Sequence, residues 1–341
     1  MSRAGRITSL KPAASIQGGE VLIECQGFDT SNRREIACTF DDVRGRIVSA
    51  LPNRVLAIVP DNVSGEVFTR LANGLETSEA ARIVIGRKLA DELHPVGNPA
   101  YDPEDGSLFV TRSGSRGQQL PTTLFRIDSS GELEEFSGEI MNPTGIAFSP
   151  AGEMFVTSRA EGVVYRVKRN GEITQFAQNM NIATGLTFDR EGRMYVGDRT
   201  GTIYRVNGIG DETPWAELEP SVSAYHMAFG PDGFMYVAGP TVSSHESILK
   251  IDPNGNQSEF FKGLGRPQGL AFDSKGNLYV AASYQGRRGI VKISPDGKDC
   301  ELAVAGMNVV GLAFGTNGDM CVATNDSVYS VAVGVYGTLL N

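Results

Sequence analysis

A stretch of about 40 residues is repeated six times after residue 96 of this chain. Each copy has an apolar run that ends in an aromatic residue, a short turn with Gly, and a second apolar run, as in RPQGLAFDSKGNLYVAA at 266–282. A period of this length is typical of repeat folds in which one copy cannot bury its own apolar faces, so the six copies are expected to share one core. The aromatics lie 47, 40, 41, 43 and 42 residues apart and are Tyr101, Phe148, Phe188, Phe229, Phe272 and Phe314.

The pattern inside each copy predicts four antiparallel strands. The first two runs are joined by a turn in which Gly supplies the conformation that other residues resist, which predicts a hairpin. A third, alternating run follows, and an Asn-Gly or Asp-Gly turn leads from it into a more polar fourth run. Six such units without a helical period predict a six-bladed β-propeller over residues 97–341.

The first 86 residues do not follow this period but alternate strongly, as in VLIEC at 21–25 and VLAIVP at 55–60. Six or seven short strands in about 80 residues predict a small, immunoglobulin-like β-sandwich, so the expected fold class is all-β with two domains. Residues 87–96 are predicted to be a linker. The alternative is an outer strand at 88–93 that closes the last blade. We favour the linker because VYSVAVGVYGTLL at 328–340 can supply the last two strands of that blade.

The charge and composition of the chain limit the classes of partner that it is expected to bind. A net charge of -9 argues against nucleic acid, whose phosphates need a basic face. No apolar run approaches the roughly 18 residues of a membrane span, and residues 1–10 lack the apolar stretch of a signal peptide. We therefore expect no membrane partner and a cytoplasmic location, or export if a signal peptide has been removed.

The four cysteines lie in strand-like runs without the spacing of metal ligands. They are expected to be buried thiols, with a disulfide between Cys25 and Cys38 as the alternative.

The spaced Gly/Pro framework of residues 7–86 resembles the IPT/TIG family of immunoglobulin-like domains. It includes Pro12, Gly18-Gly19, Gly27-Phe28, Val59-Pro60 and Asn73-Gly74. The resemblance implies a structural, spacer or interaction module.

The segments PTGIAFSPAGEMFVT, ATGLTFDREGRMYVGD and PQGLAFDSKGNLYVA resemble the NHL-repeat and gluconolactonase group of six-bladed propellers. The resemblance implies a sugar lactonase with a divalent metal held by Glu, Asn and Asp residues entering blades one, four and five. This chain has Gly97, Tyr225 and Gln268 there. These residues cannot replace the oxygen ligands that a hard cation such as calcium needs, so we expect no metal and no other cofactor.

Ligand sites of propellers form on the face that carries the loops entering the inner strands and the loops between second and third strands. The candidate ligand-binding residues on these loops are Thr144, Arg159, Thr184, Asp198, Arg199, Tyr225, Gln268 and Tyr284. The arginines favour a carboxylate or phosphate ligand.

His226 replaces the Gly that other blades have at the start of the inner strand, and His245 follows in the same blade. One hypothesis makes them a catalytic or metal-binding pair, because imidazole titrates near neutral pH. The alternative is that His226 plugs the channel and His245 is solvated. Because the family's metal ligands are missing, we expect a non-catalytic propeller that binds a small, anionic molecule or a protein on this face. The alternative function is a gluconolactonase-like hydrolase or a lyase at the channel mouth.

Overall fold

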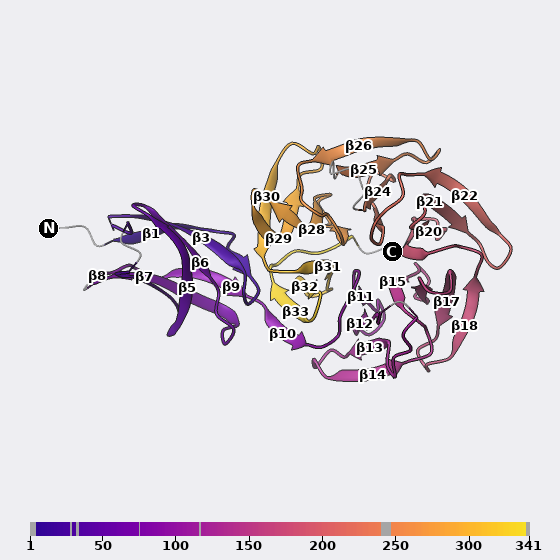
Figure 1. Ribbon diagram of the computed structural model, residues 1–341, viewed down its shortest axis with the longest axis horizontal. Helices are drawn as coiled ribbons and strands as arrows, with labels where there is room; N and C mark the ends of the chain where they lie inside the picture. The colour runs from indigo at the N-terminus through magenta and orange to yellow at the C-terminus, as the bar shows by residue number, and fades with distance from the viewer. Residues whose placement is uncertain are drawn as a thin grey trace.

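The computed structural model describes residues 5–27, 29–31, 34–74, 76–115, 117–239 and 247–338, and its regular elements there are all β-strands. Within these ranges, no helix long and apolar enough to span a membrane occurs. Figure 1 shows a ring of strands with a smaller group of strands attached at one edge. The expectation of an all-β chain with a β-propeller is confirmed.

Six sets of four antiparallel strands form the ring among the described residues. The first three blades are β11 (Ala100–Tyr101), β12 (Leu108–Thr111), β13 (Leu124–Ile127), β14 (Leu133–Ser137); β15 (Pro143–Phe148), β16 (Met154–Ser158), β17 (Val163–Val167), β18 (Ile173–Ala177); and β19 (Ala183–Phe188), β20 (Met194–Asp198), β21 (Thr202–Val206), β22 (Glu212–Glu217). The fourth and fifth blades are β23 (His226–Phe229), β24 (Met235–Ala238), β25 (Ser247–Ile251), β26 (Gln257–Lys262); and β27 (Leu270–Phe272), β28 (Leu278–Tyr284), β29 (Arg287–Ile293), β30 (Cys300–Ala305).

The sixth blade is completed by a strand from before the first one. Its three inner strands are β31 (Val309–Phe314), β32 (Asp319–Thr324) and β33 (Val328–Ala332), and β10 (Arg87–Ala90) pairs antiparallel with β33. The prediction of a linker at 87–96 is therefore wrong for β10, and the alternative of an outer strand near 88–93 holds in part. The segment after β33 instead crosses to the fifth blade, where the amide of Thr338 donates to the carbonyl of Phe272.

Repeated aromatic contacts join the blades. The second-strand ring of one blade packs on the first-strand ring of the next, with centroid distances of 5.5 Å for Phe155–Phe188 and 5.1 Å for Tyr195–Phe229. The same contact occurs in the pairs Phe109–Phe148, Tyr236–Phe272 and Tyr279–Phe314. Where the sixth blade meets the first, Tyr101 packs in one apolar cluster with Cys321. The prediction that the repeated aromatics form the core between blades is confirmed.

The N-terminal strands form two sheets that share β5 (Val43–Leu51). The other strands of these sheets are β1 (Arg6–Lys11), β3 (Glu20–Gln26), β4 (Ile36–Phe40), β6 (Arg54–Ile58), β7 (Gly65–Asn73), β8 (Glu76–Thr77) and β9 (Ala81–Ile85). Their buried faces meet in one apolar cluster that includes Val21, Phe40 and Leu71. Cys25 and Cys38 lie in this cluster as buried free thiols, so no disulfide joins them.

These sheets are continuous with the propeller. The short strand β2 (Ala14–Ser15) runs parallel to both β9 and β30, and pairs Ser15 with Ala305. The amide of Ile16 also donates to the carbonyl of Ala305 at 2.8 Å. The N-terminal strands therefore join a propeller sheet, and their resemblance to an IPT/TIG domain stays a prediction.

We expect Phe188→Ala to destabilise the protein by about 3–5 kcal/mol, because it removes a buried ring at a contact between blades. Phe188 is 3 % exposed, whereas Phe68, the control, is 44 % exposed on a strand surface. Urea unfolding should show a large loss for Phe188→Ala and little change for Phe68→Ala. Similar losses for both variants would contradict this account of the core.

We expect a chain starting at residue 86 to be more stable than one starting at residue 97. Both lack the N-terminal sheets, but only the second lacks β10 and Leu93, which is 2 % exposed in the cluster between the sixth and first blades. The outer edge of β33 is then left unpaired. Thermal unfolding followed by circular dichroism measures the difference, and equal melting temperatures would show that β10 does not close the ring.

Candidate functional site

The inner strands approach one another closely at the centre of the propeller. A Cβ added at Gly145 would collide with the carbonyl oxygen of Thr184, and one at Gly185 with that of Tyr225. Only glycine fits at these positions, because the next blade's backbone occupies the space of a side chain. The central cavity is about 50 Å³, well below the ~300 Å³ of the smallest usual ligand pockets. The channel itself is therefore too small to hold an organic ligand.

In two blades, a larger side chain stands at the position around the channel where the other blades have glycine. Asn98, in the first blade, donates from Nδ2 to the carbonyl of Leu270 at 2.9 Å and accepts from the amide of Leu312 at 3.1 Å. It thus fastens the first blade to the fifth and sixth. Sequence reasoning missed this residue, although an Asn at the ring position of a Gly was a visible signal.

His226 is the second such side chain. It is 6 % exposed, lines the central cavity, and its Nε2 has no hydrogen-bond partner among the described residues. Burial lowers the pKa of His226 from its usual 6.5 to about 4, so the imidazole is neutral at pH 7. This position matches the hypothesis of a plug. A catalytic pair with His245 stays a prediction, because His245 lies outside the described residues.

The residues at the family's metal-ligand positions do not fit a hard cation. Gly97 has no side chain, and Tyr225 is 3 % exposed with its hydroxyl donating to the backbone carbonyl of Glu219. Burial raises the pKa of Tyr225 to about 12, so the phenol stays neutral. Gln268 is half-buried and offers one neutral amide. The described residues contain no group of three or more His, Cys, Asp or Glu arranged to hold a metal ion.

Three further candidate residues hold the loops of this face together. Asp198 is buried and accepts hydrogen bonds from the amides of Asn181, Ile182 and Thr200 at 2.9–3.2 Å. Thr184 donates to the carbonyl of Gly197 at 3.0 Å, and Thr144 is 2 % exposed. Their polar groups are engaged within the protein, so they shape the site and leave recognition to other side chains.

Arg159 and Arg199 occupy equivalent positions in neighbouring blades, four residues after Phe155 and Tyr195. Each donates to a backbone carbonyl, Arg159 to Gly114 and Arg199 to Ser221, both at 3.0 Å. Neither forms an ion pair with a carboxylate among the described residues. Burial and, to a smaller extent, the positive charge of Arg199 lower the pKa of Arg159.

The insert of the first blade lies against Arg159. Asn142 donates to the carbonyls of Gly114 and Ser115 at 2.9 and 3.2 Å, and Arg159 binds the same Gly114 carbonyl. In the same loop, Arg112 has its Nε buried with no partner in the described part of the chain. Arg112 lies two residues before Gly114, whose carbonyl Arg159 binds.

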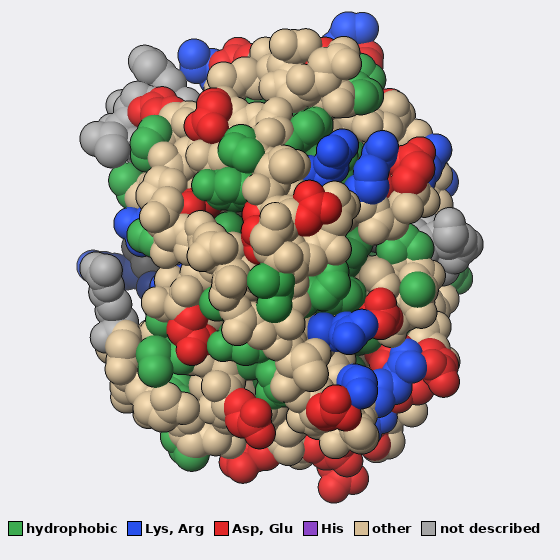
Figure 2. Space-filling model, turned by 90° about the vertical axis from the view of Figure 1, so that its right-hand side faces the viewer, with side chains coloured by type: hydrophobic (Ala, Val, Ile, Leu, Met, Phe, Trp, Pro, Cys, Tyr) green, Lys and Arg blue, Asp and Glu red, His purple; other side chains and the backbone are tan. Residues whose placement is uncertain are grey.

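The charges on the outer rim are arranged differently. Figure 2 shows this rim on the side away from the N-terminal strands, with Lys and Arg next to Asp and Glu and no continuous patch of one sign. Typical pairs are Lys168–Glu172 and Arg193–Glu191, at 2.9 and 2.8 Å. Such exposed pairs contribute little to stability. Arg159 and Arg199 on the channel face differ from these pairs, because they have like charge and no acidic partner in the part of the chain that the structure describes.

Tyr284 is not brought to this site. It ends β28, a strand of seven residues, and lines a separate cavity beside the N-terminal strands. The prediction that Tyr284 joins the channel-face residues is therefore wrong, because the hairpin of β28 and β29 extends further than those of the other blades.

Fold and site together define an all-β protein with a β-propeller whose channel is closed at its centre. The SMP-30/gluconolactonase/LRE-like region family matches residues 154–326, slightly more than half of the 341-residue chain, and the chain belongs to this family. No curated protein matches the chain in sequence.

Solved structures share the fold at low identity. An auxiliary nutrient binding protein from Bacteroides thetaiotaomicron has a TM-score of 0.55 at 15% identity, covering 96% of this chain and 97% of that one. A gluconolactonase from Xanthomonas campestris reaches 0.60 at 14% identity, covering 72% and 88%. Virginiamycin B lyase from Staphylococcus aureus reaches 0.52 at 13%, covering 92% and 99%. Such identities establish a common fold and leave the activity open.

We expect His226 to make stability depend on pH. Its pKa is lower in the folded state, so the unfolded chain binds more protons between pH 6.5 and about 4, and stability falls as pH falls through this range. At pH 5 the loss is about 2 kcal/mol relative to pH 7.5, from about 1.4 kcal/mol per pH unit. Urea unfolding at the two pH values measures it.

The variant His226→Leu should lose this part of the pH dependence, whatever its stability at pH 7.5. The matched control is His94→Leu, because His94 is exposed and should keep the parent's pH dependence. An unchanged pH dependence in His226→Leu would mean that His226 is not buried as a neutral group.

Proposed function

We propose that this protein binds a small organic anion on the channel face of its propeller and does not convert it chemically. The observation that carries the proposal is the pair Arg159 and Arg199, which occupy equivalent positions in neighbouring blades, each on a backbone carbonyl and without a carboxylate partner among the described residues. Two half-buried guanidinium groups of like charge repel each other, and an anion between them removes that repulsion.

The geometry of the pair suits a carboxylate or phosphate. Each guanidinium already donates to one backbone carbonyl, which fixes its orientation and leaves further N–H groups for a ligand. The nearby Arg112 adds a buried donor without a partner. The ligand is expected to be small because the channel behind the arginines holds only about 50 Å³.

The missing metal ligands favour binding over the lactonase reaction. The nutrient binding protein and the lyase both match nearly the whole chain in fold, so the coverage alone does not choose between binding and catalysis. The lactonase alternative requires metal ligands, and Gly97 and Tyr225 are poor substitutes for them. A lyase that uses His226 as a proton acceptor remains the alternative reaction.

We expect one of three probes, citrate, gluconate or inorganic phosphate, to bind the protein saturably in isothermal titration calorimetry. Arg199→Gln should weaken this binding about tenfold or more, since a charge-assisted hydrogen bond contributes about 1.5–3 kcal/mol. The matched control is Arg190→Gln. Arg190 lies in the turn between the first two strands of the same blade, on the opposite face, and should leave the affinity unchanged.

Two outcomes would overturn the proposal. One is that none of the three anions binds, or that Arg199→Gln and Arg190→Gln bind them equally well while both melt like the parent. The other is turnover of gluconolactone by the purified protein that disappears in His226→Leu, which would establish the enzyme alternative.

A further inference from the structure

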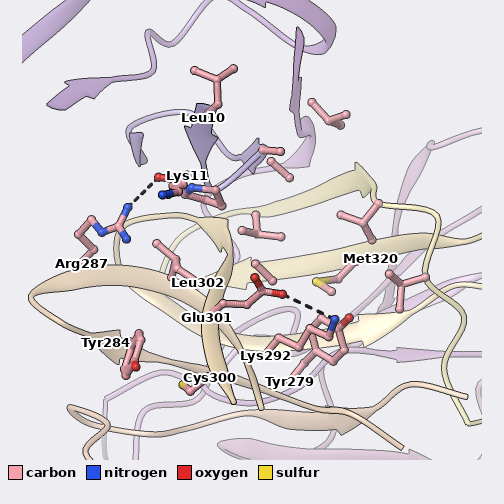
Figure 3. Close-up of a pocket in the computed structure, with 18 of the residues that line it drawn as sticks. Leu10, Lys11, Tyr279, Tyr284, Arg287, Lys292, Cys300, Glu301, Leu302 and Met320 are labelled. Carbon is pink, nitrogen blue, oxygen red and sulfur yellow. Dashed lines mark hydrogen bonds and ion pairs between the residues drawn. The ribbon is translucent and has the colours of Figure 1, made fainter. Parts of the chain in front are cut away.

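A second cavity, of about 670 Å³, lies where the N-terminal strands meet the fifth and sixth blades (Figure 3). It is separate from the channel face and shares none of the arginines described above. Its walls come from the end of β1 and the residues up to β2, from β9, from β28 to β30, and from β32, β33 and the segment after it. Small-molecule sites usually have about 300–1,000 Å³, so this cavity has the size of a ligand pocket.

The walls of this junction cavity are held in place by backbone pairing. The strand β2 is paired on one side with β9 and on the other with β30, which ties both parts of the protein together beside the cavity. Across the mouth, the Arg287 guanidinium donates from Nη1 to the carbonyl of Lys11 at 2.7 Å (Figure 3). A ligand would therefore enter a preformed site and would not have to order it.

Most of the lining is apolar. Leu302, Val304 and Met320 are at most 7 % exposed, and Tyr279 presents a buried ring to the same space. Val333 and Val335 add half-buried aliphatic groups from the segment at and after the end of β33. Such a surface binds a hydrocarbon chain or ring, because water is displaced from both.

The charged groups around the mouth are mostly cationic. Lys11, Arg82 and Lys292 are each paired with a carboxylate, namely Glu24, Glu66 and Glu301. Arg287 has no carboxylate partner among the described residues, and its hydrogen bond to Lys11 uses one of its five N–H donors. A guanidinium at the edge of an apolar cavity complements a ligand with an anionic head and an apolar body.

We propose that the junction cavity binds an amphipathic organic anion, with its carboxylate on Arg287 and its apolar part against Leu302 and Val333. This site is independent of the anion site on the channel face. Its ligand differs in chemistry, since the channel face offers charge without a deep apolar pocket.

The test is isothermal titration calorimetry of the full chain with three probes. Decanoate carries both features, acetate carries the charge without the chain, and decyltrimethylammonium carries the chain with the opposite charge. In Arg199→Gln, in which the channel-face site is weakened, decanoate should bind with one site per chain, and the other two probes should show no saturable binding. Arg199→Gln should bind decanoate as well as the parent does, which separates this result from that on the channel face.

Substitutions at the cavity should change decanoate affinity in both directions. Arg287→Gln should weaken binding about tenfold or more, and Arg288→Gln, its exposed neighbour outside the lining, should not change it. Glu301→Gln should strengthen binding several-fold, because it removes the one acidic group of the lining and frees Lys292. Ala332→Trp should abolish binding by filling the cavity from an exposed position of β33.

The proposal is overturned if decanoate does not bind the parent saturably, or if acetate or decyltrimethylammonium binds Arg199→Gln as tightly as decanoate does. It is also overturned if Arg287→Gln and Ala332→Trp, melting like the parent, both keep the parent's affinity. Because Glu301→Gln predicts a gain, a misfolded variant cannot imitate the full pattern.

Discussion

The structure depends on one repeated contact, in which an aromatic ring on the second strand of each blade packs against the first-strand aromatic of the next. Five such ring pairs have centroids within 4.8–5.9 Å, and Tyr101 with Cys321 takes the sixth place. An aromatic pair contributes about 0.5–1.5 kcal/mol beyond the area that it buries. More important is that every blade has an apolar face that only its neighbour can cover, so the ring is stable only when it is closed.

Closure of the ring also limits where a ligand can bind. Six inner strands converge on one axis, and their backbones approach so closely that Gly145 and Gly185 leave no room for a side chain. The remaining space is taken up by Asn98, which binds across two blades, and by His226, which is buried and neutral. The two proposed binding sites therefore lie outside the channel, on the loops that carry Arg159 and Arg199 and at the junction with the N-terminal strands.

The sequence predicts the ring well and its closure poorly, for physical reasons. The aromatics indicate the blades because each must be buried at the same point of the repeat. Their regular spacing can therefore be read from the sequence. The strand β10 is only four residues long and pairs with β33 more than 200 residues away, and nothing in Arg87–Ala90 encodes that partner. The apolar residues after β33 have the pattern of a strand, and they are therefore predicted to be the outer strand that β10 in fact supplies.

Some residues of the candidate site could be predicted from the repeat, and others could not. Arg159 and Arg199 follow Phe155 and Tyr195 at a fixed distance, so the repeat itself places them on one face. Tyr284 also ends a second strand, but β28 continues past the other blades and carries Tyr284 to the N-terminal strands. An extension of two residues in one hairpin does not disturb the repeat, and so it is invisible in the spacing of the aromatics.

The N-terminal strands take part both in the junction cavity and, through the chain that follows them, in closing the propeller ring. They pair with the fifth blade through β2, and the chain that leaves them becomes β10, which completes the sixth. The junction cavity has walls from all three parts, so it exists only when the N-terminal strands are docked on the closed ring. A ligand that binds only this state stabilises it by mass action, in proportion to the logarithm of its concentration relative to Kd. Occupancy of the proposed site would therefore be coupled to docking of the N-terminal strands on the fifth and sixth blades, since these three parts supply its walls.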